Sequence, residues 1–347
     1  MEYAGSYALF NYRLVDKAAG MDYSNLRLIR AFEKGLDPTS SEAGFVLVHI
    51  DMVKNSGPLI AGTMACLESC AGATTTTTSS SSSSTMSPAR TLEHRRALNG
   101  GLDGILGALR KINGVMETMW GKSKPRSYTS FRTFIFGITS QSMFPDGVVY
   151  EGVGDGKPQS FRGESGANDS MIPLMDNLLN IPMPETPLTE ILQDFRQYRP
   201  SNHREFLLWV KERSAGLEMK EWALARGLER EPGSDQMDEI KASRRLWLEV
   251  LNQVRDFRWR HWCFAREYIL KMTSHPTATG GSPIVTWLPN QLQAVLEEMV
   301  NLFESFGGGG AGLGDECRDI MDLVYRQKDT LAKEVHKYCE ERGVTAS

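Results

Sequence analysis

A single histidine lies in the middle of an otherwise apolar predicted helix face. Seven residues follow one another at alternating steps of three and four, which places them all on one face of a helix. They are Trp247, Val250, Val254, Phe257, His261, Phe264 and Tyr268. A core histidine that donates to a backbone carbonyl would explain this imidazole. A metal or haem ligand would explain it too, since neutral imidazole is a common protein ligand of iron.

The neighbours of His261 bear on this choice. Arg258 lies three residues, about one turn, before it on an adjoining edge of the helix, where a planar guanidinium could pair with a carboxylate such as a haem propionate. Asp256 and Glu267 point away from the apolar face, so this helix offers no second ligand for a zinc or two-metal site. A lone ligand suits a macrocycle that supplies the other in-plane bonds to its metal.

The elements expected to position His261 are mainly helices. Helical periodicity covers 100–120, 188–198, 288–306 and 315–341, and a long stretch at 238–272 that could be broken once. The stripe within 100–120 consists of Leu102, Ile105, Leu109, Ile112 and Met116. Two short runs, 45–50 and 131–138, fit either a strand or a buried helix segment. We therefore predict an all-α fold.

Three segments separate these helices. The tract 71–88 holds five threonines and then six serines in a row, and it is predicted to be a disordered loop insertion. The segment 144–166 reads as a connection, and its Gly-x-Gly-x-Gly string at 152–156 lacks the strand and helix of a dinucleotide site. The glycine-rich stretch 307–314 predicts a joint between helices within a single domain, 1–347.

Composition excludes several classes of protein. A formal net charge of −4 argues against a nucleic-acid partner, which needs a positive field. No stretch approaches the roughly 20 apolar residues of a membrane span, and the N-terminus does not resemble a signal peptide. The five cysteines are scattered, so we expect reduced thiols and a cytoplasmic protein.

Several segments of the chain, taken in order, resemble the indoleamine 2,3-dioxygenase family. The segment DFRWRHW at 256–262 resembles the family's proximal-histidine helix. PDGVVYEG at 145–152, FRGESGA at 161–167 and TATGGSP at 277–283 resemble three of its loops. Further landmarks lie at 3–12, 24–28, 45–49, 131–134 and 194–207. Together the landmarks span about residues 3 to 305.

This resemblance implies a haem b enzyme that oxidises L-tryptophan with dioxygen to N-formylkynurenine, in the kynurenine pathway of tryptophan catabolism. It also implies a monomer that needs an electron donor to keep the iron ferrous. Carried over by position, the metal ligand is His261 and the propionate partner is Arg258. The substrate-binding residues are Phe45, Arg132, Gly166 and Thr279, and the catalytic residues are His49 and Ser165.

The sequence also departs from the family's pattern. A smaller helical domain normally precedes the segment that begins here at Tyr3, and we expect it to be absent. Ser127 and Tyr128 stand where the family tends to place aromatic residues. A packed core histidine would explain His49 as well as a catalytic role does. Two alternatives therefore stay open, namely a non-catalytic haem-binding relative and a dioxygenase of another indole in specialised metabolism.

Overall fold

The computed structural model describes residues 5–78, 88–163, 169–185, 194–225, 233–273, 284–307, 313 and 316–343. Helices predominate in these ranges, as predicted. The longer ones are α1 (Ser41–Val53), α2 (Ser56–Thr78), α3 (Pro88–Glu117), α5 (Pro125–Arg132), α6 (Met171–Leu178), α8 (Ser201–Gly216), α10 (Ser234–Ala265), α11 (Ile284–Ser305) and α12 (Glu316–Arg342). The short helices α4 (Met119–Lys122) and α9 (Met219–Leu224) connect them.

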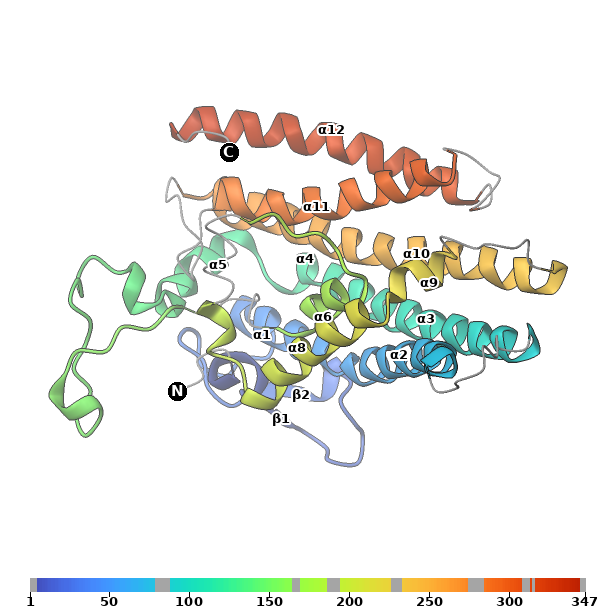
Figure 1. Cartoon of the computed structure of the whole chain (residues 1–347). Helices are drawn as coiled ribbons and strands as arrows, with labels where there is room; N and C mark the ends of the chain where they lie inside the picture. The colour runs from blue at the N-terminus through green and yellow to red at the C-terminus, as the bar shows by residue number, and fades with distance from the viewer. Residues whose placement is uncertain are drawn as a thin grey trace.

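Five long helices form the body of the molecule. They lie side by side in the order α12, α11, α10, α3 and α2 (Figure 1). The helices α1, α5, α6 and α8 gather at one end and side of this stack. The helix α10, which carries His261, therefore lies in the middle of the bundle, between α3 and α11.

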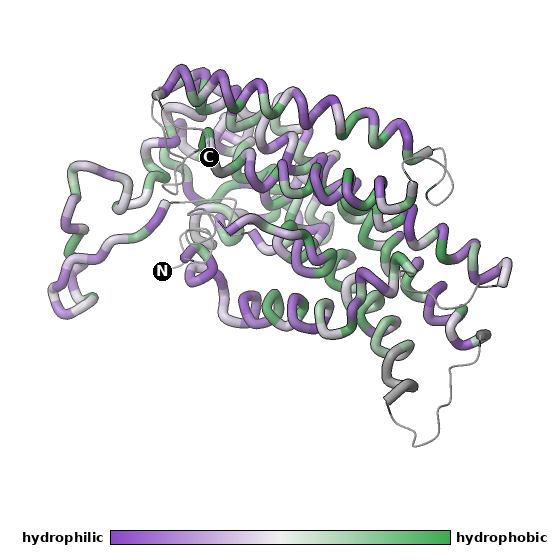
Figure 2. Tube along the Cα trace, turned by 45° about the horizontal axis from the view of Figure 1, so that its top comes forward, coloured by the Kyte–Doolittle hydropathy of each residue, from purple (hydrophilic) through white to green (hydrophobic). Residues whose placement is uncertain are grey.

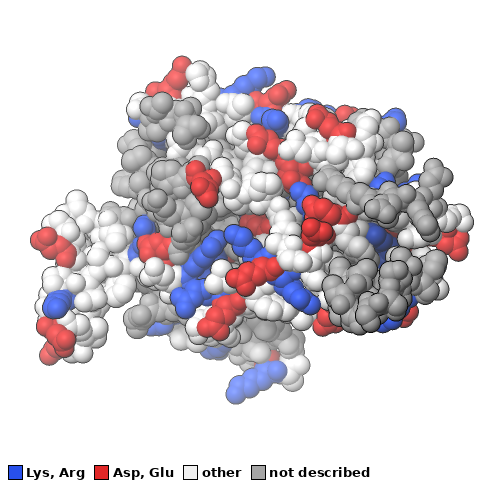
Figure 3. Space-filling view, in the orientation of Figure 1, with Lys and Arg blue, Asp and Glu red and all other residues white. Residues whose placement is uncertain are grey.

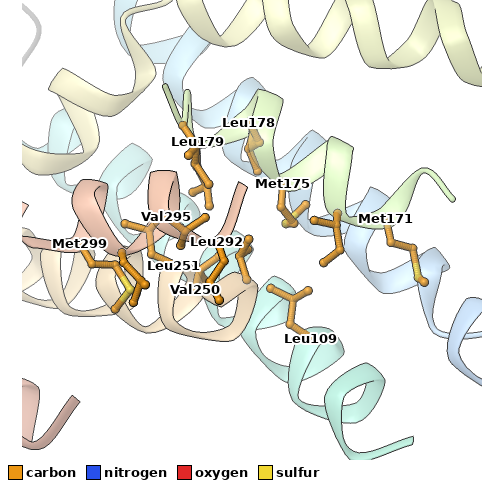
Figure 4. Packing of buried hydrophobic residues seen from close by; sticks show 14 of the residues in the cluster. Leu109, Met171, Met175, Leu178, Leu179, Val250, Leu251, Leu292, Val295 and Met299 are labelled. Carbon is orange, nitrogen blue, oxygen red and sulfur yellow. The ribbon is translucent and has the colours of Figure 1, made fainter. Parts of the chain in front are cut away.

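The core follows the periodicity of the helices. The predicted stripe from Leu102 to Met116 on α3 is buried, which confirms the prediction for this helix. Side chains of α3, α6, α10 and α11 meet in one apolar cluster that includes Leu109, Met175, Val250 and Val295 (Figure 4). This cluster anchors α10 and α6 to the rest of the bundle.

Glycines allow the closest approach between α2 and α3. A Cβ added at Gly62 would lie 2.8 Å from the carbonyl oxygen of Gly101, and one at Gly101 would lie 2.7 Å from Cys66 Sγ. The two backbones could not pack this closely with larger residues at these positions. All five cysteines of the chain are free thiols, as predicted.

Two local predictions need correction or completion. The run 45–50 lies inside α1, and 131–138 begins at the end of α5 and continues through a 3₁₀ turn, Thr133–Ile135, so both are helical rather than strand-like. The described residues contain one two-stranded antiparallel sheet that the sequence did not reveal, β1 (Tyr12–Leu14) with β2 (Leu26–Leu28). Strands of three residues are too short to show alternation.

The described ends of the Thr/Ser-rich tract 71–88 are helical. The helix α2 continues to Thr78 and α3 begins at Pro88, so the prediction of a disordered loop was wrong for residues 71–78. Extending an existing helix by one residue adds one backbone hydrogen bond, which offsets the weak helix propensity of threonine. Residues 79–87 lie outside the described residues, as do most of 188–198 and of 307–314.

An extended arm leaves the body between Phe136 and Gly163. It projects to the left in Figure 1 and carries mixed polar and apolar residues (Figure 2). A β-bridge between Val148 and Gln159 and a hydrogen bond from the Thr139 N–H to the Phe161 carbonyl oxygen join its two branches. The glycine string lies here, with Gly152, Gly154 and Gly156 all at positive φ, so it forms turns rather than a phosphate-binding loop.

The surface carries charges of both signs. Basic and acidic side chains are interspersed on the face shown in Figure 3. No helix in the described part of the chain is long and apolar enough to cross a membrane.

Candidate functional site

The apolar face of α10 opens around His261. Trp247 and Val254 on this face are fully buried, and Tyr268 beyond the histidine is 5% exposed. Between these buried ends, Phe257 and Phe264 are only half-buried and His261 itself is exposed. A sequence that is apolar along the whole face therefore has an accessible stretch in its middle, and the histidine is at the centre of that stretch.

The surroundings of the imidazole are nevertheless those of a protein interior. Burial, with a smaller contribution from the cation Arg258, lowers the pKa of His261 to about 4. We infer that the ring lies in a concavity rather than on an open surface, because water can reach it although it is strongly desolvated. We call this concavity, lined by Phe257, His261 and Phe264, the histidine recess. Near pH 7 the imidazole is neutral, so one ring nitrogen has a lone pair for a metal.

Arg258 and Asp176 form a buried ion pair beside the recess. Arg258 is 4% exposed, and its Nη2 donates to Asp176 Oδ2 at 2.7 Å. Burial raises the pKa of Asp176, and Arg258 opposes this rise. The remaining atoms Arg258 Nη1 and Asp176 Oδ1 are buried and have no hydrogen-bond partner among the described residues. A buried guanidinium with one unsatisfied nitrogen is suited to a second anionic partner.

The helix α12 supports α10 from the side opposite the recess. The indole Nε1 of Trp262, the residue after the histidine, donates to Glu334 Oε2 at 2.6 Å. Glu334 also pairs with Arg266, and Arg255 donates to Gln327 on α12. These contacts fix the backbone of α10 on either side of His261 from the face that packs against α12.

Beyond Ala265 the helix widens into a π-helical turn, Arg266–Leu270. Such turns insert an extra residue and re-aim the side chains that follow. Tyr268 lies in this turn, and its hydroxyl donates to the carbonyl oxygens of Ser123 and, at 3.4 Å, Met119. Burial raises the pKa of Tyr268 to about 12, so its proton stays on the hydroxyl.

Two predicted residues lie one turn apart on α1. The ring of Phe45 lies 5.2 Å from that of Tyr128 and 5.7 Å from that of Phe131, both on α5. His49 Nε2 lies 3.4 Å from Asp169 Oδ2, in the segment that leads into α6. The structure therefore brings α1, α5 and the start of α6 together.

A glycine sets the position of α1. A Cβ added at Gly44 would lie 1.9 Å from the carbonyl oxygen of Lys122, which is backbone and cannot swing aside. Only glycine permits this approach between α1 and the end of α4. Because Gly44 immediately precedes Phe45, the same contact determines where the aromatic ring lies.

Arg132 is a buried cation at the end of α5. It is 4% exposed, and its guanidinium lies 4.5 Å from the centre of the Phe136 ring. Burial lowers its pKa, and an interaction with Tyr128, including a hydrogen bond, opposes this effect. Tyr128 thus contacts both Phe45 and Arg132, which joins two of the predicted substrate-binding residues through one side chain.

Aromatic contacts connect these residues to the helix of His261. Tyr128 lies 5.6 Å from Tyr268, and Tyr268 lies 5.7 Å from both Trp120 and Phe264. Phe264, in turn, lines the histidine recess. A continuous set of rings therefore runs from the recess to Phe45, although these residues are spread over more than 200 positions of the chain.

Three predicted residues, Ser165, Gly166 and Thr279, lie outside the described residues. Within the described part of the chain, no three His, Cys, Asp or Glu side chains gather into a group that could hold a metal ion. The sequence reasoning missed Asp169 and Asp176, and it named Tyr128 only as a departure from the family's pattern. Asp176 offered a signal, because it is an acid within the apolar run 171–179, whereas Asp169 offered none that periodicity could detect.

The described residues together define a mainly helical protein with one histidine in a recess on α10, beside a buried arginine. The family model for indoleamine 2,3-dioxygenase matches residues 1–313, so the chain belongs to the indoleamine 2,3-dioxygenase family. Proteins of this family are haem-dependent dioxygenases, so membership supports a haem dioxygenase activity.

Individual relatives are distant. The chain is 26% identical over 326 residues to indoleamine 2,3-dioxygenase 1 of Mus musculus, which covers 92% of the chain and 67% of the mouse protein. It is 24% identical to the Rattus norvegicus protein of the same name, over 94% of the chain and 67% of that protein. A 6-hydroxytryptophan 2,3-dioxygenase of Fusarium equiseti is 29% identical over 121 residues, 34% of the chain and 29% of that protein.

Proposed function

We propose that this protein binds haem b through His261 and oxidises L-tryptophan with dioxygen to N-formylkynurenine. The observation that carries the proposal is the histidine recess, in which a lone neutral imidazole is accessible within an apolar face of α10. Metal ligation requires the neutral form of imidazole, and the lowered pKa keeps His261 in that form well below pH 7.

The residues present fit a haem. His261 supplies one nitrogen ligand, and Phe257 and Phe264 supply apolar surface for a flat macrocycle. A propionate would give the buried Arg258 Nη1 the acceptor that it lacks among the described residues. When bound, the haem supplies the activation of dioxygen, while the chain positions the substrate and excludes water.

The chain's own residues would hold tryptophan at both ends. Arg132 would bind the carboxylate, since a desolvated guanidinium forms strong, charge-assisted hydrogen bonds. Phe45, held against Tyr128 and Phe131, would pack on the indole. The roles of His49, Ser165, Gly166 and Thr279 are proposed from the family resemblance.

The test is to load the full chain with haem, reduce it with an added electron donor, and measure N-formylkynurenine formed from L-tryptophan. Arg132→Ala should raise the KM for tryptophan while leaving the haem absorption unchanged. Arg126→Ala, an exposed arginine on the same helix, is the matched control and should behave like the parent. Loss of haem from Arg132→Ala would contradict the substrate role of this residue.

A second candidate is a dioxygenase of a substituted indole. The name of the Fusarium equiseti relative, 6-hydroxytryptophan 2,3-dioxygenase, favours including it. Comparing kcat/KM for tryptophan and 6-hydroxytryptophan decides between the two substrates. A chain that shows a normal haem spectrum but consumes neither indole would instead be a non-catalytic haem-binding relative.

A further inference from the structure

The contact between His49 and Asp169 joins two distant parts of the chain. His49 lies on α1 and Asp169 comes two residues before the start of α6, 120 positions later. Their closest atoms, Nε2 and Oδ2, are 3.4 Å apart, and their side chains are only 18% and 14% exposed. Because little water reaches the pair, water competes only weakly for the hydrogen bond between them.

Asp169 is held in place independently of His49. Its Oδ1 accepts the backbone N–H of Met171, two residues on, at 2.7 Å, which forms an Asx turn just before α6 begins. Its backbone carbonyl oxygen accepts from Arg199 Nη2 at 2.9 Å. The first bond holds the carboxylate and the second holds the backbone of Asp169, so Oδ2 is presented to His49 from a fixed position.

We propose that Asp169 is a positioning residue that keeps a proton on Nε2 of His49 and so fixes the orientation of this imidazole. An ionised carboxylate can only accept hydrogen bonds, so the ring nitrogen that faces it must carry the proton. The ring cannot turn Nε2–H toward another acceptor without leaving Oδ2 unpaired. The proposal rests on the proposed function only in assigning His49 to the substrate side of the haem.

A fixed ring matters for a reaction whose substrate must be held flat. Preorganised groups raise reaction rates because the chain need not order them when the substrate binds. The carboxylate also gives the imidazole a defined donor and acceptor pattern, which a freely rotating ring would not have. Asp169 therefore acts through His49 and does not itself need to touch the substrate.

The sharpest test is Asp169→Asn in the full chain. The amide oxygen of asparagine can still accept from the Met171 N–H, so the start of α6 is kept. Its NH₂ group then faces His49 and can only donate, so Nε2 must become the acceptor and the proton must move to Nδ1. Asp169→Ser is a second variant, whose hydroxyl can form a similar turn with the Met171 N–H but is too short to reach the ring.

The readout is the protonation of each ring nitrogen by ¹⁵N NMR of the chain without haem, at neutral pH. The chain contains six histidines, so His49→Gln identifies the resonances of His49. In the parent, Nε2 should give the shift of a protonated nitrogen. In Asp169→Asn that signature should be lost, and in Asp169→Ser it should become mixed. An Nε2 that is unprotonated in the parent, or that stays protonated in both variants, overturns the proposal.

A matched control exists in the same molecule. His336 Nε2 lies 3.3 Å from Glu340 Oε1, but these side chains are 73% and 70% exposed. Water competes for such an exposed pair, so Glu340→Gln should leave the His336 resonances unchanged. Haem absorption and product formation are measured separately. A chain that binds no haem or forms no product would contradict the proposed function and leave the NMR result unchanged. An NMR result that overturns the role of Asp169 would leave haem absorption and product formation unchanged.

Discussion

The two sides of the candidate site are built in different ways. The ligand side comes from one continuous helix, α10, in which His261, Arg258 and the recess-lining rings lie within eight residues. The substrate side is assembled from α1, α5 and the start of α6: Tyr128 follows Phe45 by 83 residues, and Asp169 follows Tyr128 by a further 41. Local periodicity defines the first side, whereas tertiary contacts define the second. The two sides should therefore respond differently to substitution.

The largest effect is expected at His261. Replacement by alanine removes the only proposed protein ligand of the iron and should weaken haem affinity by more than about 100-fold, since even outer-shell partners cost 10–100-fold. The measurement is haem titration followed by absorption spectroscopy. His203→Ala, an exposed histidine on α8, is the control and should titrate like the parent. An unchanged spectrum for His261→Ala would show that the ligand side is built around another residue.

The buried pair beside the ligand gives the next largest effect. Arg258→Ala leaves Asp176 as an uncompensated buried charge, which should lower the free energy of unfolding by about 3–5 kcal/mol. Urea denaturation of the chain without haem measures this change. Arg260→Ala is the matched control, because Arg260 pairs with Asp256 and Glu117, whose side chains and its own are 24–54% exposed to water, so the substitution should cost less than about 1 kcal/mol.

A double variant separates the two roles of Arg258. Arg258→Met with Asp176→Leu should recover most of the lost stability, because apolar residues often replace buried ion pairs without cost. It should not recover haem affinity if Arg258 Nη1 binds a propionate. Recovery of both properties would mean that the arginine acts only on folding.

On the substrate side, Gly44→Ala should lower the free energy of unfolding by about 1–3 kcal/mol, because the added Cβ collides with the Lys122 carbonyl and displaces α1. We also expect a raised KM for tryptophan with normal haem absorption. Gly107→Ala is the control, since Gly107 lies in an exposed part of α3 with no atom near its added Cβ. It should stabilise the chain by roughly 0.5–1 kcal/mol. Equal effects of the two substitutions would remove the argument for Gly44.

The smallest expected effect is a pH dependence of stability. The pKa of His261 is about 4 in the folded chain and 6.5 in a model peptide. Between these values the unfolded chain binds a proton that the folded chain does not, so the free energy of unfolding should fall as the pH drops from 6.5 to 4. The accessible ring limits the size of the effect. Parallel pH profiles for the parent and His261→Gln, without haem, would contradict it.

The sequence predicted the helix of the proposed ligand well. The steps of three and four from Trp247 to Tyr268 indicated a single helix, and the structure confirms one long helix with a single change at Arg266. Periodicity is reliable here because every residue that defines the face belongs to one element. The sequence could not show that this face becomes accessible at Phe257 and is buried again at Tyr268. The exposure of the face depends on which other helices cover it.

The substrate side was predicted only through the family resemblance. The spacing of Phe45 and His49 placed them one turn apart, but nothing in the spacing indicated that Asp169 would meet His49 across 120 residues. A contact between residues so far apart in the chain depends on how the helices pack, as at Gly44, and not on the local spacing of apolar residues. The strand pair β1–β2 and the extension of α2 to Thr78 were missed for the corresponding reason, since short or weakly patterned segments depend on their context.

The helix α6 gives the two sides a common mechanical support. Asp169, two residues before it, contacts His49, and Asp176, in its second turn, contacts Arg258. One short segment of the chain thus supplies a carboxylate to each side of the site. If a ligand bound at either side makes α6 more or less ordered, the binding of haem and the binding of substrate are thermodynamically linked. Haem and substrate would then change each other's affinity by the same factor, and the helix would be the element that couples them.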